Sequence, residues 1–389
     1  MLDFIYNTPT KVYFGKDKQL LVGQIISELG YKKIMMQYGK DSIKKSGLYD
    51  QVVASLKEYN IEYIELGGVE PNPKVQFIRN AIKIAKEEKV ELILAVGGGS
   101  VIDSSKYTAM GAKYDGDVWD FPMGKAVPKD ALPVGCILTL SAAGSEMSNS
   151  AVVTDLTLNK KKGCTTEFNR CKFAIMNPEL TYSVSKYQTA CGIVDIMSHT
   201  MERYFTVCEP TMLTDSIAES LLKSVVSVGE KAIENPNDYD ARATLMWASS
   251  LSHNGLTFCG RENMLAVHQL EHALSGKFDS VAHGAGLAVL LPAWAKYVYK
   301  YNTARFSQFA RNVWGVVEED DEKASLFGIE KMSEFFAKIG MPTKIREFGI
   351  AKGNEDELAL LCTNDRTRVI KNYIPLGYKE VKEIFESCY

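Results

Sequence analysis

VELILAVGGGSVIDSSK, residues 90–106, decides the fold of this chain. Its first part, residues 90–97, is an apolar run of the length expected for a buried strand, and glycines follow it directly. Beyond the glycines, residues 101–112 have the pattern of a helix. A strand that passes through a glycine turn into a helix is the first half of a strand–helix–strand unit, which predicts parallel pairing.

The same alternation surrounds this segment on both sides. Short apolar runs are followed by amphipathic stretches, and this order implies right-handed crossovers with helices on both faces of a parallel sheet. The expected strands are residues 32–39, 61–68, 90–97, 133–141 and 172–178, and the expected helices are residues 48–59, 75–89 and 101–112.

The pattern changes near residue 180. From Ser185 onward the chain consists of long amphipathic segments with almost no β-branched runs. We therefore predict an α/β domain at residues 1–180, followed by an all-helical domain at residues 181–389. The helices expected in the second domain are residues 187–205, 214–234, 238–258, 261–275, 284–301 and 326–338.

Length and composition exclude several classes of protein. A chain of 389 residues is too long for one ordinary core. Its net charge of −3 is unclustered, so we expect neither nucleic acid nor a membrane surface as a partner. The eight cysteines include no CxxC pair, which argues against a disulfide framework and favours a reducing compartment. With no signal pattern or spanning apolar run, we expect a cytoplasmic protein.

The glycine turn is a candidate phosphate-binding loop. Gly97, Gly98, Gly99 and Ser100 stand between a strand and a helix, where backbone N–H groups and the helix dipole favour an anion. Asp103 lies in the first turn of that helix, where a carboxylate suits the dipole. The pattern is not the GxGxxG dinucleotide fingerprint, so a plain tight turn is the alternative.

The end of the first strand is a second candidate for cofactor contact, because ligands bind beyond the carboxyl ends of parallel strands. The sequence there is Gly39-Lys40-Asp41-Ser42. An acidic residue at such a position holds the ribose of NAD, whereas a basic residue accommodates the phosphate of NADP. Lys40 favours NADP and Asp41 favours NAD, so these residues alone do not decide between the two cofactors.

Three of the five histidines lie in one segment, MLAVHQLEHALSGKFDSVAHGAG, residues 264–286. His268 and His272 are four residues apart and share a helix face, and His283 opens a turn-like HGAG run. Neutral imidazole is the commonest nitrogen ligand for divalent metals. A pair at this spacing also arises by chance on a packing surface.

A second segment supplies the missing half of a metal site. In GIVDIMSHTMERYF, residues 192–205, Asp195 and His199 are again four apart on a helix. Together with His268 and His283 they make one carboxylate and three imidazoles, a set that suits Fe(II) or Zn(II) rather than magnesium or calcium. His253, in SSLSHNGL, is interpreted as structural.

These motifs together resemble the iron-containing (group III) alcohol dehydrogenase family, most closely its butanol dehydrogenase type. The resemblance covers nearly the whole chain and rests on motifs in the same order. They are FIYNTPTKVYFGK, GGGSVIDSSK, LTLSAAGSEMSNSAVVTD, GIVDIMSHTME and HQLEHALSG followed by AHGAGLA.

The resemblance implies a Rossmann-like, dinucleotide-binding first domain and a helical, metal-binding second domain. By matching position it makes Asp195, His199, His268 and His283 the metal ligands. It places Gly97, Gly98, Gly99, Ser100 and Asp103 at the pyrophosphate, and Thr139, Ser141, Ser145 and Lys161 at other parts of the cofactor. His272 is not a ligand in this comparison, and we assign it as a candidate catalytic proton relay.

The chain departs from the family at two places. Lys40 stands where an aspartate marks NAD preference in some members, and members that prefer NADPH often have YGGGS where this chain has YGKDS. We therefore favour NADP(H) over NAD(H), with Gly39, Lys40 and Ser42 as contacts. The interval between His268 and His283 is one residue longer than is common, and the extra residue falls in a loop.

The activity implied by the resemblance is reversible, NAD(P)H-dependent reduction of aliphatic aldehydes to primary alcohols. The metal is expected to polarise the carbonyl oxygen and the nicotinamide to carry the hydride. The expected partners are a small alcohol or aldehyde and a second copy of the chain in a homodimer. A glycerol or polyol dehydrogenase of the same superfamily is the alternative, and a non-catalytic metal- or nucleotide-binding protein is a more distant one.

Overall fold

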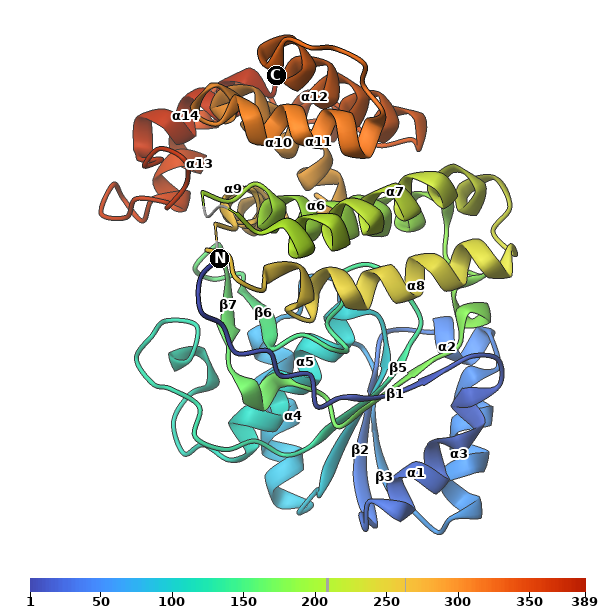
Figure 1. Cartoon of the computed structure of the whole chain (residues 1–389). Coiled ribbons are helices and arrows are strands. Elements are labelled where there is room, and N and C mark those ends of the chain that lie inside the picture. Colours follow the sequence, from blue (N-terminus) through green and yellow to red (C-terminus); the bar gives the residue numbers. More distant parts are fainter. Residues whose placement is uncertain (208–209, 263) are drawn as a thin grey trace. The chain divides into compact units, whose positions relative to one another are not determined.

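The computed structural model describes residues 1–207, 210–262 and 264–389. The chain divides into two compact units (Figure 1). One is Asn7–Val184, and the other joins Met1–Tyr6 to Ser185–Tyr389. The first six residues thus belong with the helical unit, although the sequence analysis grouped them with the α/β domain. Within the described residues, every helix is too short or too polar to cross a membrane.

The Asn7–Val184 unit, which we call the α/β unit, is built on a parallel sheet, as predicted, but the sheet has six strands because residues 11–14 add a strand that was not expected. The strand order is β1-β8-β5-β4-β2-β3. The strands are β1 (Lys11–Phe14), β2 (Lys33–Tyr38), β3 (Glu62–Leu66), β4 (Leu92–Gly97), β5 (Val134–Leu138) and β8 (Phe173–Met176). The helices are α1 (Val22–Glu28), α2 (Ser42–Lys45), α3 (Leu48–Glu58), α4 (Val75–Glu87) and α5 (Gly99–Ala112).

Both faces of this sheet are covered, because its central strands are apolar on both sides. Ile34 and Met36 of β2 share one cluster with side chains of α1 and α3. On the opposite face, the Gln37 side chain donates to the hydroxyl of Thr108 on α5 at 3.0 Å. A strand buried on both faces needs a continuous apolar run rather than alternation. This is why residues 90–97 identified the sheet.

An antiparallel hairpin of β6 (Ser150–Asp155) and β7 (Lys160–Thr165) was missed by the sequence analysis. Its second strand, KKKGCT, has little apolar character. The hairpin is anchored instead by Lys106, a buried lysine on α5. The ammonium group of Lys106 donates to the carbonyl oxygens of Ser145, Ser148 and Ser150 at 2.6, 3.1 and 2.9 Å.

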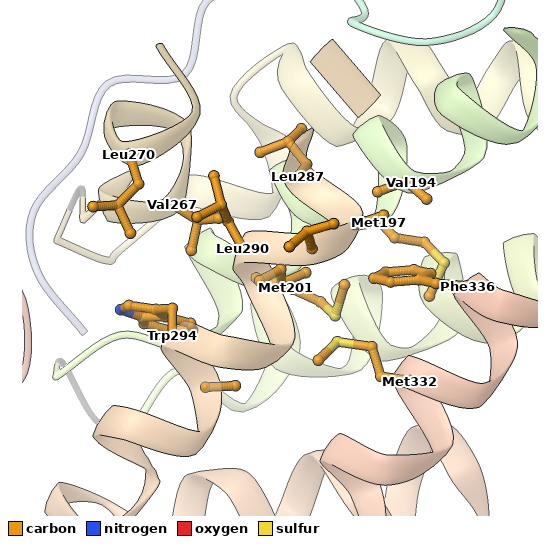
Figure 2. Close-up of a cluster of buried hydrophobic side chains, with 14 of the residues drawn as sticks. Val194, Met197, Met201, Val267, Leu270, Leu287, Leu290, Trp294, Met332 and Phe336 are labelled. Atoms are coloured by element: carbon orange, nitrogen blue, oxygen red, sulfur yellow. The ribbon is translucent and has the colours of Figure 1, made fainter. Parts of the chain in front are cut away.

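The second unit, which we call the helical unit, contains no strand among its described residues. Its helices are α6 (Lys186–Tyr204), α7 (Met212–Glu234), α8 (Tyr239–His253), α9 (Ala266–Lys277), α10 (His283–Val298), α11 (Thr303–Trp314), α12 (Asp321–Lys338), α13 (Glu355–Cys362) and α14 (Tyr378–Ser387). Its core joins α6, α9, α10 and α12 (Figure 2). Val194, Met197 and Met201 of α6 lie there beside Leu287 and Leu290 of α10.

Several predicted helices have different bounds in the structure; α12, for example, begins at Asp321 rather than at residue 326, and α11, α13 and α14 were not predicted. The helix expected at residues 238–258 ends at His253, because Gly255 has φ of +105° and breaks it. The helix expected at residues 261–275 begins only at Ala266, and residue 263 of that prediction lies outside the described residues.

Candidate metal centre and nucleotide-binding edge

Helix α6 presents two different faces to its surroundings. Val194, Met197 and Met201 point into the apolar core (Figure 2). Asp195 and His199, four residues apart, lie on another face with Glu202 a turn further along. All three of these polar residues are buried, with side-chain exposures of 5%, 6% and 0%. Buried charged groups at this density require partners, so this face marks a candidate site.

The other two candidate ligands arrive from α9 and the start of α10. His268 lies in the first turn of α9, and His283 is the first residue of α10. The next residue, Gly284, lets α10 begin directly against α6. A Cβ atom on Gly284 would lie 2.1 Å from the carbonyl oxygen of Cys191. The HGAG run is therefore a helix start in close contact with α6, not an isolated turn.

One carboxylate oxygen lies near nitrogen atoms of three histidines. Oδ1 of Asp195 is 3.2 Å from Nδ1 of His199, 3.5 Å from Nε2 of His268 and 3.7 Å from Nε2 of His283. Ligands bonded at about 2.1 Å in a tetrahedron are separated by about 3.4 Å, which matches this spacing.

The hydrogen bonding of these atoms agrees with a metal site. Asp195 Oδ1, His199 Nδ1 and His268 Nε2 are buried and have no hydrogen-bond partner among the described residues. Such atoms are destabilising when unpaired, because they lose hydration without replacement. The residues present therefore fit a divalent cation with nitrogen and oxygen ligands.

The electrostatics differ between the histidines. Burial lowers the pKa of His199 well below its usual value, and the neighbouring His253 and His268 add to that effect, so this imidazole is neutral. Burial also acts to lower the pKa of His268, but the carboxylates of Glu202 and Asp195 outweigh it and raise the pKa to about 9. A metal must therefore displace a proton from His268 at neutral pH.

The candidate nucleotide residues meet at the carboxyl edge of the parallel sheet in the α/β unit. Tyr38 is paired with Val96 and Gly97 with Leu138 across neighbouring strands. The segments that follow these strands, residues 39–42, 97–100 and 139–141, are thus adjacent. The backbone N–H of Thr139 donates to the carbonyl oxygen of Gly97 at 3.1 Å.

Within this edge, the glycines are needed for close packing. Gly98 precedes the first residue of α5, and a Cβ atom there would lie 3.1 Å from Cβ of Leu140. A Cβ atom on Gly99 would lie 3.3 Å from Cβ of Ala143. The hydroxyl of Ser141 is buried without a hydrogen-bond partner among the described residues. The edge thus offers backbone N–H groups and a hydroxyl to a ligand.

Asp103, Ser145 and Lys161 form a protein network behind this edge. One oxygen of Asp103 accepts a hydrogen bond from the hydroxyl of Ser145 at 2.5 Å, and the other accepts from the N–H of Val152 at 2.9 Å. Burial raises the pKa of Asp103, against the opposing charges of Lys106 and Lys161. Lys161 lies on β7 opposite Thr154. The bond to Val152 therefore holds the hairpin to α5, and the bond to Ser145 holds the loop that precedes the hairpin.

Comparison with known protein families assigns both units of the chain to one family. A family model for iron-containing alcohol dehydrogenase matches residues 9–178, and a model for the C-terminal region of the same family matches residues 189–389. The chain belongs to the iron-containing alcohol dehydrogenase family. It is therefore an enzyme, an oxidoreductase, as the sequence motifs predicted.

Several relatives of this iron-containing alcohol dehydrogenase match it over most of their length. It is 42% identical to NADH-dependent butanol dehydrogenase A of Clostridium acetobutylicum, and the match covers 100% of both chains. It is 35% identical to the NADPH-dependent aldehyde reductase YqhD of Escherichia coli, over 90% of each chain. Among solved structures, NADH-dependent butanol dehydrogenase A of Thermotoga maritima superposes with a TM-score of 0.96 at 38% identity, covering 100% of this chain and 99% of that one.

Two further histidines of this alcohol dehydrogenase lie beside the cluster. The ring centroid of His272, on α9, is 5.8 Å from that of His283 and 6.4 Å from that of His268. The ring of His253 is 4.1 Å from that of His199, and its Nδ1 lies 2.7 Å from a guanidinium nitrogen of Arg203. The structure thus brings all five histidines of the chain into one region of the helical unit.

The sequence analysis missed two glutamates of the site. Glu202 pairs with Nδ1 of His268, and Glu271 pairs with Nδ1 of His283. The spacing of Glu202 from Asp195 and His199, at i+7 and i+3, places it on their face of α6 and was a usable signal. The pairing of Glu271 with His283 depends on how α9 and α10 pack, which spacing alone does not give.

Proposed function

We propose that this alcohol dehydrogenase reduces aliphatic aldehydes to primary alcohols, and reverses the reaction, with a metal ion and NAD(P)H. The observation that carries the proposal is the convergence of three imidazole nitrogens on one oxygen of Asp195 within 3.7 Å. Relatives named butanol dehydrogenase and aldehyde reductase support this substrate class.

The metal ligands in this proposal are Asp195, His199, His268 and His283. One carboxylate and three neutral imidazoles leave a bound Fe²⁺ or Zn²⁺ with a net positive charge, and the family description favours iron. Such an ion supplies Lewis-acid polarisation of a carbonyl or alcohol oxygen. The task of the protein is to hold four side chains from three helices at fixed separation in a water-poor setting.

The nucleotide contacts in this proposal are the residues at the carboxyl edge of the sheet. The N–H groups at the start of α5, a helix of 14 residues, bind the pyrophosphate through Gly97, Gly98, Gly99 and Ser100. Thr139 and Ser141 contact the cofactor directly. Asp103, Ser145 and Lys161 act at its margin, where Asp103 also fixes the hairpin. The nicotinamide supplies the hydride.

For the choice between NADP(H) and NAD(H), we propose that Lys40 promotes use of NADP(H) and that Glu70 opposes it. The side chain of Lys40 is 74% exposed, and its Nζ lies 3.9 Å from a carboxylate oxygen of Glu70. A free lysine at this edge attracts the 2′-phosphate of NADP, whereas a nearby carboxylate repels it. Both cofactors are therefore accepted, which agrees with NADH- and NADPH-dependent names among the relatives.

We assign proton transfer to His272. Its imidazole is partly exposed and lies beside the ring of His283 rather than in the buried cluster. An imidazole in this position can pass a proton between solvent and the oxygen of the substrate. His272→Ala is expected to retain metal and to lower turnover by about 10- to 100-fold.

The proposed function is tested by metal analysis of protein purified without chelators, followed by an aldehyde assay with NADH and with NADPH. One equivalent of iron or zinc per chain and oxidation of either cofactor by butanal are expected. Activity that survives complete removal of the metal would reject the metal mechanism. A homodimer, the expected assembly, is checked on the same sample by light scattering.

A further inference from the structure

We infer that Glu202 and Glu271 are positioning residues that hold two of the proposed metal ligands, His268 and His283, by their far nitrogens. The inference rests on the proposed metal centre and assigns to it two residues beyond the four ligands. In both histidines Nε2 faces Asp195, and Nδ1 contacts a glutamate. Each imidazole is thus held at Nδ1 while its Nε2 is directed at Asp195.

Glu202 is held by three donors. One of its oxygens accepts from the backbone N–H of Val267 at 2.6 Å. The other accepts from the backbone N–H of His268 at 3.3 Å and is paired with Nδ1 of the same residue. The carboxylate therefore joins α6 to the first turn of α9, where its charge also suits the helix dipole. Its position is set before any metal binds.

Glu271 holds His283 from the opposite side of the cluster. It lies on α9, three residues after His268, and its side chain is fully buried. A Cβ atom on Gly286 would lie 3.0 Å from Cγ of Glu271, so the glycine leaves room for this side chain. The pair connects α9 to the start of α10. His283 is the more exposed of the two histidines, at 25% against 8% for His268.

The chemical consequence is the same at both histidines. A carboxylate that accepts from Nδ1–H keeps the proton on that nitrogen and leaves the lone pair of Nε2 directed at the metal position. The negative charge also makes the imidazole a stronger donor to a cation. Both glutamates have side-chain exposures of 0%, and a carboxylate with that burial is stabilised only by such partners.

The test compares isosteric and truncating substitutions at each glutamate. Glu271→Gln keeps the shape and one acceptor but removes the charge, whereas Glu271→Ala removes both; Glu202→Gln and Glu202→Ala form the second pair. Glu219→Gln is the matched control. Glu219 is also buried in the helical unit, and it accepts hydrogen bonds from Tyr204, Gln308 and Asn312 at 2.7 to 2.9 Å.

The measured quantity is the dissociation constant for Co²⁺ or Zn²⁺, from competition with a chromophoric chelator, together with the visible spectrum of the Co²⁺ protein. We expect the glutamine variants to bind metal about 10-fold more weakly and the alanine variants about 100-fold more weakly. The d–d bands of Co²⁺ should shift in both pairs, and the Glu219→Gln control should keep the wild-type affinity and spectrum.

The outcomes separate this inference from the proposed function. Wild-type protein that binds no metal would overturn both. Wild-type protein that binds one ion, with glutamine variants of unchanged affinity and spectrum, would overturn only the positioning role. Two ions per chain, falling to one in Glu271→Gln, would instead make Glu271 a ligand of a second ion. If an alanine variant does not fold, the isosteric glutamine variants decide the question.

Discussion

The proposed metal cluster in the helical unit and the proposed nucleotide-binding edge in the α/β unit are built on opposite principles. The cluster consists of side chains from three helices, and Asp195 and His268 at its centre are 5% and 8% exposed. The edge consists of backbone from neighbouring strand ends, and its charged residue Lys40 is 74% exposed. Buried charges fix a geometry strongly but leave no tolerance for loss of one member. A backbone edge distributes binding over many N–H groups, so each change has a smaller effect.

The largest expected effect is at the metal cluster. His268→Ala removes a proposed ligand and leaves Asp195 and Glu202 buried with fewer partners. We expect loss of bound metal and a fall in aldehyde reduction by about 10³-fold, since a Lewis acid contributes several kcal/mol to carbonyl polarisation. Elemental analysis and kcat are measured together. The neighbouring variant His272→Ala is the control for metal content, and a His268→Ala protein with full metal content contradicts the assignment.

The nucleotide-binding edge should respond differently to a single change. Gly98→Ala adds a Cβ atom 3.1 Å from Cβ of Leu140, directly before the first residue of α5. We expect KM for the nicotinamide cofactor to rise by about 10-fold, because the backbone no longer approaches the pyrophosphate closely, while metal affinity stays unchanged. Gly163→Ala, on the exposed hairpin strand with only an ordinary 3.4 Å contact, is the control. An unaltered KM in Gly98→Ala would remove this loop from the binding site.

The two regions also differ in how much of each could be predicted from the sequence. The sheet followed from continuous apolar runs, and the adjacency of residues 39–42 and 97–100 followed from parallel topology. The four proposed ligands were predicted from an aspartate and imidazoles at helical spacing together with the family resemblance. Glu202 and Glu271 were missed because a buried glutamate is indistinguishable in sequence from an exposed one. The β7 strand was missed because three of its six residues are lysines, and it is the partner strand β6 that the buried Lys106 holds, through the carbonyl oxygen of Ser150.

Titration of Glu65 with acid should change the stability of the α/β unit, and this effect is smaller than the two above. Glu65, at the end of β3, accepts hydrogen bonds from Tyr38, Tyr49 and Lys44. Hydrogen bonds from the two phenols, and then from the ammonium group, lower the pKa of Glu65 from 4.5 to about 2, although burial acts to raise it. A lowered pKa stabilises the folded state fully above about pH 4.5, and this stabilisation is lost as the pH falls through 2.

Glu65→Gln should therefore destabilise the α/β unit at pH 7 by about 1 kcal/mol, a value reduced for solvent screening because a third of the side chain is exposed. The difference from wild type should shrink as the pH falls from about 4.5 toward 2. Urea unfolding followed by circular dichroism at several pH values measures it. A difference that stayed constant down to pH 2 would show that the charge of Glu65 has no part in it.

The smallest expected effect is at Lys40. This exposed residue of the nucleotide-binding edge contrasts most with the buried residues of the metal cluster. The Nζ atom of Lys40 lies 3.9 Å from a carboxylate oxygen of Glu70 on the surface, and surface pairs of this kind are worth about 0.2–1 kcal/mol. Lys40→Ala should therefore lower the ratio of kcat/KM for NADPH to that for NADH by about threefold, and Glu70→Gln should raise it by a similar factor. Lys83→Ala is a matched control, because Lys83 is 72% exposed and lies 3.9 Å from Glu87. If the Lys40 and Glu70 substitutions change the NADPH-to-NADH ratio of kcat/KM in opposite directions, and the control leaves it unchanged, this pair determines cofactor choice. If both substitutions change the ratio in the same direction, they act through general surface charge. The determinant of cofactor choice would then lie in the backbone of the edge.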